Sequence, residues 1–255
     1  MMLSACIEWL FKAEHEDFCD RIRAARDAGL GGVEFHMWRN KPLDEIERTL
    51  AETGLALTSL LVEPRVQLVD PGAQEAVLTA IHESLPIARR LKSPALVVAS
   101  GPLVQGATRE AQHASMVSIL KAAAPIVEDA GITLLLEPVN TLVDHPGVYL
   151  DRTPEGLDVI EEVGSPRVRL LYDMYHSTAM GEAPEQVLGA RMHLVAHVQV
   201  ADSPGRHEPG SGAIDWKHYL GVLHAKGYTG AIGLEYRPSG DTLASLQLAR
   251  RSLGL

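Results

Sequence analysis

Four polar residues interrupt apolar runs of the sequence, each close to the end of its run. Glu137 closes ITLLL, Asp173 closes VRLLY, Gln199 follows VAHV and Glu235 follows AIGL. If these ends meet, the three carboxylates repel one another unless a cation lies between them. Oxygen ligands without a thiolate suit Mg2+ or Mn2+ better than a structural zinc ion, so the pattern predicts a divalent-metal site. For any one residue an ion pair or a helix cap is an equally good explanation; four in successive runs favour a shared site.

Elements that would position these residues are visible as an alternation of short apolar runs and longer amphipathic stretches. The runs that we interpret as strands are 3–9, 32–36, 55–62, 95–100, 132–137, 168–173, 195–202 and 231–236. Helical patterns occupy 17–29, 75–91 and 109–131, among others. Several helical stretches end at a glycine just before a strand, as left-handed caps do: Gly29, Gly54, Gly131 and Gly227.

The count and composition of the runs indicate the fold class. Eight strands in 255 residues leave about 32 residues for each unit, the size of one βα repeat. Nearly continuous apolar strands are typical of a parallel sheet that helices cover. An open, doubly wound sheet shows the same alternation, but the count of eight and the lack of a GxGxxG turn after the first strand favour a barrel. We therefore predict an α/β protein, a single-domain (β/α)8 TIM barrel over residues 1–255, whose strand ends converge on one face.

Composition restricts the class of partner. With 33 acidic and 23 basic residues the formal charge is −10, which disfavours binding to nucleic acid or to anionic membranes and favours cations and small substrates. The two cysteines, Cys6 and Cys19, are interpreted as buried free thiols. The first residues lack the basic start and apolar core of a signal peptide, so we expect a cytoplasmic protein. No feature marks an oligomer interface, and a homo-oligomer stays open.

Four segments carry a resemblance to a known family. EPVNTLVDHPGVYLDR, YDMYHS, HVQVADSPGRHEPGSGAIDW and GLEYRPSGDT resemble the hydroxypyruvate isomerase family, within the xylose-isomerase-like TIM barrels. The likeness extends over essentially the whole chain and is most specific between residues 134 and 242. It implies that Glu137, Asp173, Gln199 and Glu235 bind a divalent metal cation and that the two glutamates are the catalytic acid/base pair. Many relatives, including ketose 3-epimerases, carry histidine in place of Gln199.

The resemblance also implies an activity in carbohydrate metabolism. We expect conversion of hydroxypyruvate to tartronate semialdehyde by metal-assisted proton transfer through an enediolate. One of Glu137 and Glu235 would remove the proton alpha to the carbonyl; whether one base or two take part is left open by the sequence. The segment VEFHMWRNK after the second strand departs from the family pattern, so His36 and Trp38 are expected to reshape the substrate pocket.

Further residues are candidates for substrate binding. They are His36, Glu63, His176, Arg206, His207 and Glu208. His176 follows Asp173 by three residues and is interpreted as a hydrogen-bond partner of a substrate oxygen, the alternative being a surface or capping role. Arg206 is a candidate for a substrate carboxylate, and Glu208 for orienting a neighbouring base. Pairing of Glu63 with an arginine is as good an explanation as substrate contact.

Other residues receive structural interpretations. Glu8 and Glu34 lie in or near strands and are interpreted as paired core groups, whereas His145, in a turn before a proline, either lines the mouth of the site or has no role.

Three rival functions remain. The nearest is a 2-oxo-tetronate isomerase or a ketose 3-epimerase, because the same enediolate serves each reaction. A hydrolase that resembles apurinic-site endonucleases would need several metal-binding histidines and a basic surface. A non-catalytic sugar-acid binding protein is disfavoured, because buried carboxylates are costly to retain without a function.

Overall fold

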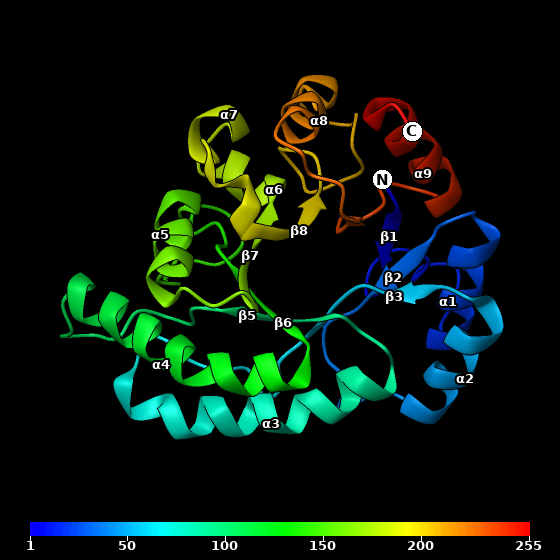
Figure 1. Ribbon diagram of the computed structural model, residues 1–255. Coiled ribbons are helices and arrows are strands. Elements are labelled where there is room, and N and C mark those ends of the chain that lie inside the picture. Colours follow the sequence, from blue (N-terminus) through cyan, green and yellow to red (C-terminus); the bar gives the residue numbers. More distant parts are fainter.

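The apolar runs of the sequence form parallel strands in this computed structural model, which describes residues 1–255. The strands are β1 (Leu3–Cys6), β2 (Gly32–Glu34), β3 (Ala56–Leu57), β4 (Leu60–Leu61), β5 (Ala95–Ala99), β6 (Thr133–Glu137), β7 (Val168–Asp173), β8 (Val195–Val200) and β9 (Ile232–Leu234). Every run expected to be a strand contains one, and each βα unit returns the chain to the next parallel strand. Figure 1 looks along the resulting barrel, with the helices outside the strands.

The third expected strand, 55–62, is divided into two short strands that close the barrel. The sheet order is β3-β2-β1-β9-β8-β7-β6-β5-β4, so its two ends are consecutive in the chain. β3 pairs with β2 and β4 pairs with β5. Two further backbone hydrogen bonds tie this segment to β2 and the loop after it. The Thr58 N–H donates to the Val33 carbonyl oxygen at 2.9 Å, and the Leu61 N–H donates to the His36 carbonyl oxygen at 3.1 Å. The nine strands therefore occupy eight barrel positions, and the predicted (β/α)8 fold is confirmed.

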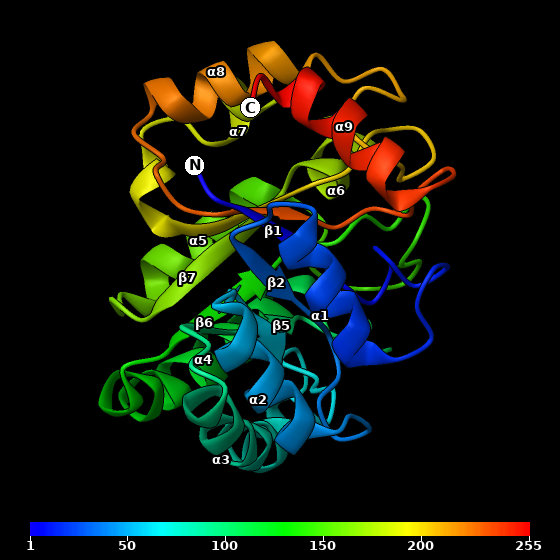
Figure 2. The same ribbon diagram turned by 90° about the vertical axis from the view of Figure 1, so that its right-hand side faces the viewer.

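The helices form the outer layer. They are α1 (Phe18–Asp27), α2 (Leu43–Thr53), α3 (Gln74–Arg90), α4 (Arg109–Ala130), α5 (Thr153–Val163), α6 (Met174–Ala179), α7 (Pro184–Val187), α8 (Trp216–Ala225) and α9 (Thr242–Leu253), with 3-10 turns at Pro71–Ala73 and Arg191–Leu194. Figure 2 shows α8 and α9 together on one side and α1 and α2 on another. None of these helices combines the length and the apolarity that a membrane crossing requires.

Helix ends follow the expected chemistry. Asp17 and Asp241 accept backbone hydrogen bonds in the first turns of α1 and α9, which satisfies donors that have no partner inside the helix. Gly54 and Gly131 cap α2 and α4 with φ of 71° and 69°, a left-handed conformation that glycine adopts without strain. Gly29 and Gly227 also have positive φ, just past the ends of α1 and α8.

Alternation along the strands determines which side chains face the barrel axis. Successive side chains of a strand point to opposite faces, so Leu135 shares a face with Glu137, and Leu171 shares one with Asp173. Leu135 and Leu171 pack with Ala95 and Val97 in a small buried cluster, separate from the large cluster of helix-facing side chains. Inside the barrel, the carboxylates of β6 and β7 therefore lie next to a layer of apolar side chains from β5, β6 and β7.

Close approach of α5 to the barrel gives a test of this packing. A Cβ at Gly156 would lie 2.8 Å from Leu170 Cδ1 and 2.9 Å from Pro138 Cγ, and the proline ring cannot rotate away. Gly156→Ala should lower the free energy of unfolding by about 1–3 kcal/mol, although alanine is the better helix former. At Gly221 in α8 a Cβ meets nothing within 4 Å, so Gly221→Ala should instead raise it by roughly 0.5–1 kcal/mol.

Urea denaturation of the two variants and the parent protein provides the comparison. Equal stabilisation by both substitutions would show that α5 does not pack on β7 as closely as described.

Candidate active site

Strand register brings the four interrupting residues to one end of the barrel. Glu137 and Asp173 are the last residues of β6 and β7, Gln199 lies in β8, and Glu235 directly follows β9. These four strands are neighbours in the sheet. Asp173 is opposite Gln199, and Gln199 is opposite Gly233, two residues before Glu235. The side chains thus come from adjacent positions of the same barrel face.

Two basic side chains link the acids into a single cluster. His176 Nε2 lies 3.8 Å from Glu137 Oε1 and 3.6 Å from Asp173 Oδ2. Arg206 Nη2 lies 3.0 Å from Glu235 Oε2 and 3.8 Å from Asp173 Oδ2. Apart from Glu137, which is partly exposed, all of these residues are buried. The structure therefore brings together the predicted ligands and two of the predicted substrate-binding residues.

Two buried oxygen atoms in this cluster have no hydrogen-bond partner: Asp173 Oδ2 and Gln199 Oε1. Asp173 uses its other oxygen to accept from the backbone of Tyr175 at 2.8 Å and of His176 at 3.3 Å, capping α6. Leaving a buried acceptor unpaired costs about 1–3 kcal/mol, unless another group satisfies it. Carboxylate and amide oxygens are ligands of hard divalent cations, so these residues fit Mg2+ or Mn2+.

The orientation of Gln199 is set from below by Glu34. Gln199 Nε2 donates to Glu34 Oε1 at 2.8 Å, and a carboxylate can only accept, so the amide oxygen must turn the other way. Glu34 Oε2 is held by His197 Nε2 at 2.8 Å and by the Thr58 hydroxyl at 3.0 Å. A Cβ at Gly233 would lie 2.5 Å from Glu34 Oε1, so the pair needs glycine there. Glu34 is thus the paired core group that its place inside a strand predicts.

The protein's own charges perturb the three carboxyl groups in different ways. Burial, together with Glu235 and Asp173, raises the pKa of Glu137 well above its ordinary value. Burial also raises the pKa of Asp173 to about 7, against the effect of Arg206. For Glu235 burial is outweighed by Arg206 and by the hydrogen bond from His36, and its pKa falls to about 2. A cation among them would offset both the cost of burial and the mutual repulsion, which together raise the pKa values of Glu137 and Asp173.

His176 presents one defined ring nitrogen to the acids. Its Nδ1 accepts from the Asn140 backbone at 3.2 Å and from Asn140 Nδ2 at 2.7 Å. Burial and the charge of Arg206 lower the pKa of His176 to about 3, so the ring is neutral. A neutral imidazole that accepts at Nδ1 carries its proton on Nε2, which is the atom near Glu137 and Asp173. The ring of His145 lies 5.4 Å from that of His176.

Arg206 is fixed by aromatic contacts and by its loop. Its guanidinium lies 4.6 Å from the Trp9 ring centroid and 5.0 Å from that of Tyr175. The buried Asp202 organises the loop: its Oδ1 accepts from Ile214 N at 3.2 Å, and its Oδ2 accepts from Trp216 Nε1 at 2.9 Å. Arg206 itself has φ of 57°, a conformation that a non-glycine residue holds only when its surroundings impose it. The Nε–H of Arg206 is buried without a partner.

The remaining candidates contact other residues of the protein around the site. His36 Nε2 lies 2.7 Å from Glu235 Oε1, so this histidine joins the cluster. Glu63 Oε2 accepts from the backbone of Trp38 and Arg39 at 2.7 and 2.9 Å, which braces the loop after β2. Glu208 accepts from the backbone N–H of Ser239 at 3.0 Å and from its hydroxyl, joining the loops after β8 and β9. His207 Nδ1 contacts the Arg237 carbonyl oxygen at 2.7 Å. Substrate contact by these four residues stays a prediction.

Sequence reasoning missed several residues of the cluster. Asn140, Trp9 and His197 hold His176, Arg206 and Glu34, and the thiol of Cys6 lies 3.6 Å from His36 Nε2. For Asn140 a signal existed, because it follows Glu137 by three residues in the same loop. The contact of Trp9 with Arg206 joins segments that lie far apart in the sequence and has no local signal.

A model of the family described as xylose isomerase-like TIM barrel matches residues 22–253. The chain belongs to this family. The hydroxypyruvate isomerase of Escherichia coli strain K12 is 30% identical, over 91% of this chain and 92% of that protein. A putative hydroxypyruvate isomerase of Homo sapiens is 30% identical over 98% of this chain and 94% of that protein. The 2-oxo-tetronate isomerase of Cupriavidus necator is also 30% identical, over 93% of this chain and 94% of that protein. The predicted resemblance is confirmed, and this member of the family is an isomerase.

Solved structures agree on the fold. The crystal structure of an AP endonuclease, family 2, from Brucella melitensis superposes with a TM-score of 0.89 at 29% identity, over 96% of this chain and 97% of that one. A structure of the IOLI protein with a binding zinc atom has a TM-score of 0.81 at 18% identity, over 99% of this chain and 96% of that one. The second likeness shows the fold alone.

The contact between Glu34 and Gln199 generates a prediction about metal binding. In Glu34→Gln the neutral amide no longer forbids Gln199 from turning its oxygen downwards. Mn2+ affinity should fall roughly 10- to 100-fold, the range typical when a group that orients a metal ligand is changed. Glu14→Gln is the control, because Glu14 is likewise a hydrogen-bond acceptor, with two bonds from Thr242, and lies outside the cluster. Free Mn2+ measured by electron paramagnetic resonance gives both affinities, and equal values for the two variants would refute the orienting role of Glu34.

Proposed function

We propose that this isomerase interconverts hydroxypyruvate and tartronate semialdehyde. The observation that carries the proposal is the pair of unpartnered oxygens, Asp173 Oδ2 and Gln199 Oε1, in a buried cluster with two further carboxylates. Relatives named hydroxypyruvate isomerase are 30% identical to this chain over nearly its whole length, which supports the choice of substrate. Glu137, Asp173, Gln199 and Glu235 would hold the cation. When bound, Mg2+ or Mn2+ supplies Lewis acidity at a carbonyl oxygen.

The proton transfer requires no net change in composition. One proton leaves C3, the hydroxymethyl carbon, a proton arrives at C2, and the hydroxyl hydrogen moves from the oxygen on C3 to that on C2. Glu137 and Glu235 are the two carboxylates proposed to take and return these protons. They come from strands separated by β7 and β8, so substrate carbons between them could be reached from either side. The same pair serves a one-base or a two-base route.

His176 is proposed to stabilise the developing enediolate. Its ring holds a proton on Nε2, because Asn140 occupies Nδ1 as a donor. A neutral donor fixed beside the reacting atoms stabilises negative charge on a substrate oxygen without having to reorganise. The buried position of His176 also excludes water from that side of the site.

Arg206 is proposed to bind the substrate carboxylate. A guanidinium presents donors in a planar fork that matches a carboxylate, and the Nε–H of Arg206 has no protein partner. The aromatic rings of Trp9 and Tyr175 hold the guanidinium in place. This assignment favours short keto acids over neutral ketoses. The 2-oxo-tetronates are also acids, and the relative with that activity is equally similar, so chain length is what separates the two substrates.

Endonuclease activity, which the name of the Brucella protein raises, is less well supported. Binding of the DNA backbone depends on basic side chains, whereas this chain carries a formal charge of −10.

An assay on metal-stripped protein tests the proposal. Hydroxypyruvate, a 2-oxo-tetronate, a neutral ketose and DNA with an abasic site are offered in turn, with Mg2+ or Mn2+ added back. We expect turnover of hydroxypyruvate to depend on added metal and to exceed turnover of the tetronate and the ketose. Glu235→Gln should lower kcat by roughly 100-fold or more, as loss of a general acid or base does.

Glu128→Gln is the control, because Glu128 accepts a hydrogen bond from Ser165 away from the cluster. Full turnover by Glu235→Gln, or turnover that survives removal of all metal, would contradict the mechanism. Preference for the tetronate, the ketose or DNA would contradict the substrate.

A further inference from the structure

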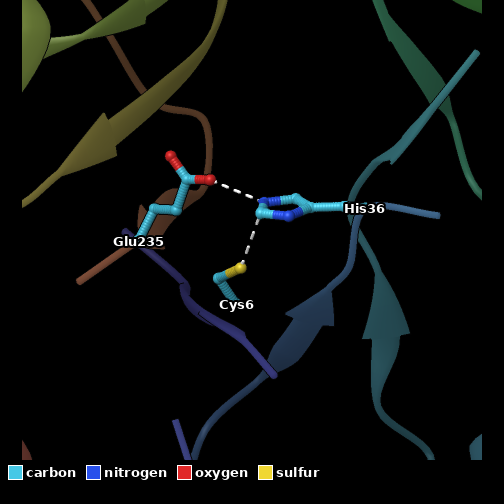
Figure 3. A group of neighbouring side chains, drawn as sticks. All are labelled: Cys6, His36 and Glu235. Carbon is cyan, nitrogen blue, oxygen red and sulfur yellow. Dashed lines mark hydrogen bonds and ion pairs between the residues drawn. The ribbon is translucent and has the colours of Figure 1, made fainter. Parts of the chain in front are cut away.

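A second group of metal-binding side chains lies beside the oxygen cluster. Cys6 is the last residue of β1, His36 follows β2 by two residues, and Glu235 directly follows β9. These three strands are neighbours in the sheet, in the order β2-β1-β9. Figure 3 shows the three side chains converging on one point between the strand ends, with the imidazole between the thiol and the carboxylate.

One of the two distances already suits a tetrahedral zinc ion, and the other needs a small adjustment. Cys6 Sγ lies 3.6 Å from His36 Nε2, and His36 Nε2 lies 2.7 Å from Glu235 Oε1. Zinc binds sulfur at about 2.3 Å and nitrogen or oxygen at about 2.0–2.2 Å, which places a sulfur and a nitrogen ligand about 3.6 Å apart. Nitrogen and oxygen ligands then lie roughly 3.3 Å apart, so the contact between His36 and Glu235 has to open by about half an ångström. A small rotation of the two side chains provides that.

The donor set differs in kind from that of the neighbouring cluster. One thiolate, one imidazole and one carboxylate select zinc and similar cations, whereas Mg2+ and Mn2+ prefer oxygen ligands alone. One potential ligand atom from each of Cys6, His36 and Glu235 lies within 4.8 Å of the other two. Arg206 also contacts Glu235, but it carries a positive charge and cannot ligate. We propose that Cys6, His36 and Glu235 form an inhibitory site for zinc, distinct from the site for the catalytic cation.

Inhibition follows from the sharing of Glu235. This carboxylate is proposed to bind the catalytic cation and to transfer a proton, and zinc held by Cys6 and His36 would draw it away from both tasks. The entrance is His36, whose side chain is 27% exposed while that of Glu235 is 7% exposed. Binding releases the thiol proton to solvent, as cysteine ligation requires, and leaves one tetrahedral position for water. The effect on turnover rests on the proposed function, whereas the binding of zinc does not.

Cobalt(II) replaces zinc as the spectroscopic probe. Bound to Cys6, it should give a thiolate-to-cobalt charge-transfer band in the near ultraviolet, which the oxygen cluster has no sulfur to produce. The band should appear in the parent protein loaded with Mg2+ and in Cys19→Ala, the matched control whose buried thiol lies in α1. It should be absent in Cys6→Ala and in Cys6→Ser, which keeps a side chain of similar size. Circular dichroism verifies that both variants fold.

Zinc titrated into the Mg2+-loaded enzyme provides the functional arm. Cys6→Ala should need roughly tenfold more zinc, or more, for half inhibition, because loss of a direct ligand costs at least what loss of an orienting group does. No charge-transfer band in the parent protein, or a band that persists without Cys6, would overturn the site. A band with equal zinc sensitivity in the parent and Cys6→Ala would show binding without the proposed inhibition. If the enzyme does not act on hydroxypyruvate, the spectrum still decides the site.

Discussion

Three carboxylates that meet at one end of the barrel, from β6, β7 and β9, are the constraint on which the rest of the site depends. Because they lie close together and are largely shielded from water, they cannot all ionise unless positive charge lies among them. Part of that charge comes from Arg206, which lies against Glu235 and Asp173. Two buried oxygens, Asp173 Oδ2 and Gln199 Oε1, accept no hydrogen bond from the protein. The charge and the ligand types of the cluster suit the proposed cation, and the loop after β8 holds the positive charge of Arg206 beside it.

The barrel interior below the site is divided in its chemistry. Under β5–β7 it is filled by small and branched apolar side chains, which give the carboxylates a dry floor. Under β8, β9 and β1–β3 it holds a polar network in which Glu34 accepts from Gln199, His197 and Thr58. The first half strengthens electrostatic interactions, since the dielectric constant is low there. The second half determines which way the amide of Gln199 points, so it orients one of the proposed metal ligands.

The sequence predicted the fold and the meeting of the four interrupting residues at one end of the barrel. Strand ends leave a local signal there, an acid or an amide after an apolar run. It also indicated His176, which follows Asp173 by three residues, and Arg206, which lies in a loop rich in glycine and proline. The division of 55–62 into two strands was missed, because it depends on pairing with β2 on one side and β5 on the other. Contacts such as Trp9 with Arg206 or Cys6 with His36 join distant segments and were unpredictable for the same reason. Loop bracing by Glu63 and Glu208 depends on backbone donors that a sequence does not reveal.

Anomalous diffraction from crystals grown with Mn2+ tests the central claim most directly. The account predicts one strong peak within roughly 2–2.5 Å of Asp173 Oδ2 and Gln199 Oε1, with oxygens of Glu137 and Glu235 completing the ligand set. A peak elsewhere on the protein, with water molecules satisfying those two oxygens instead, would contradict it.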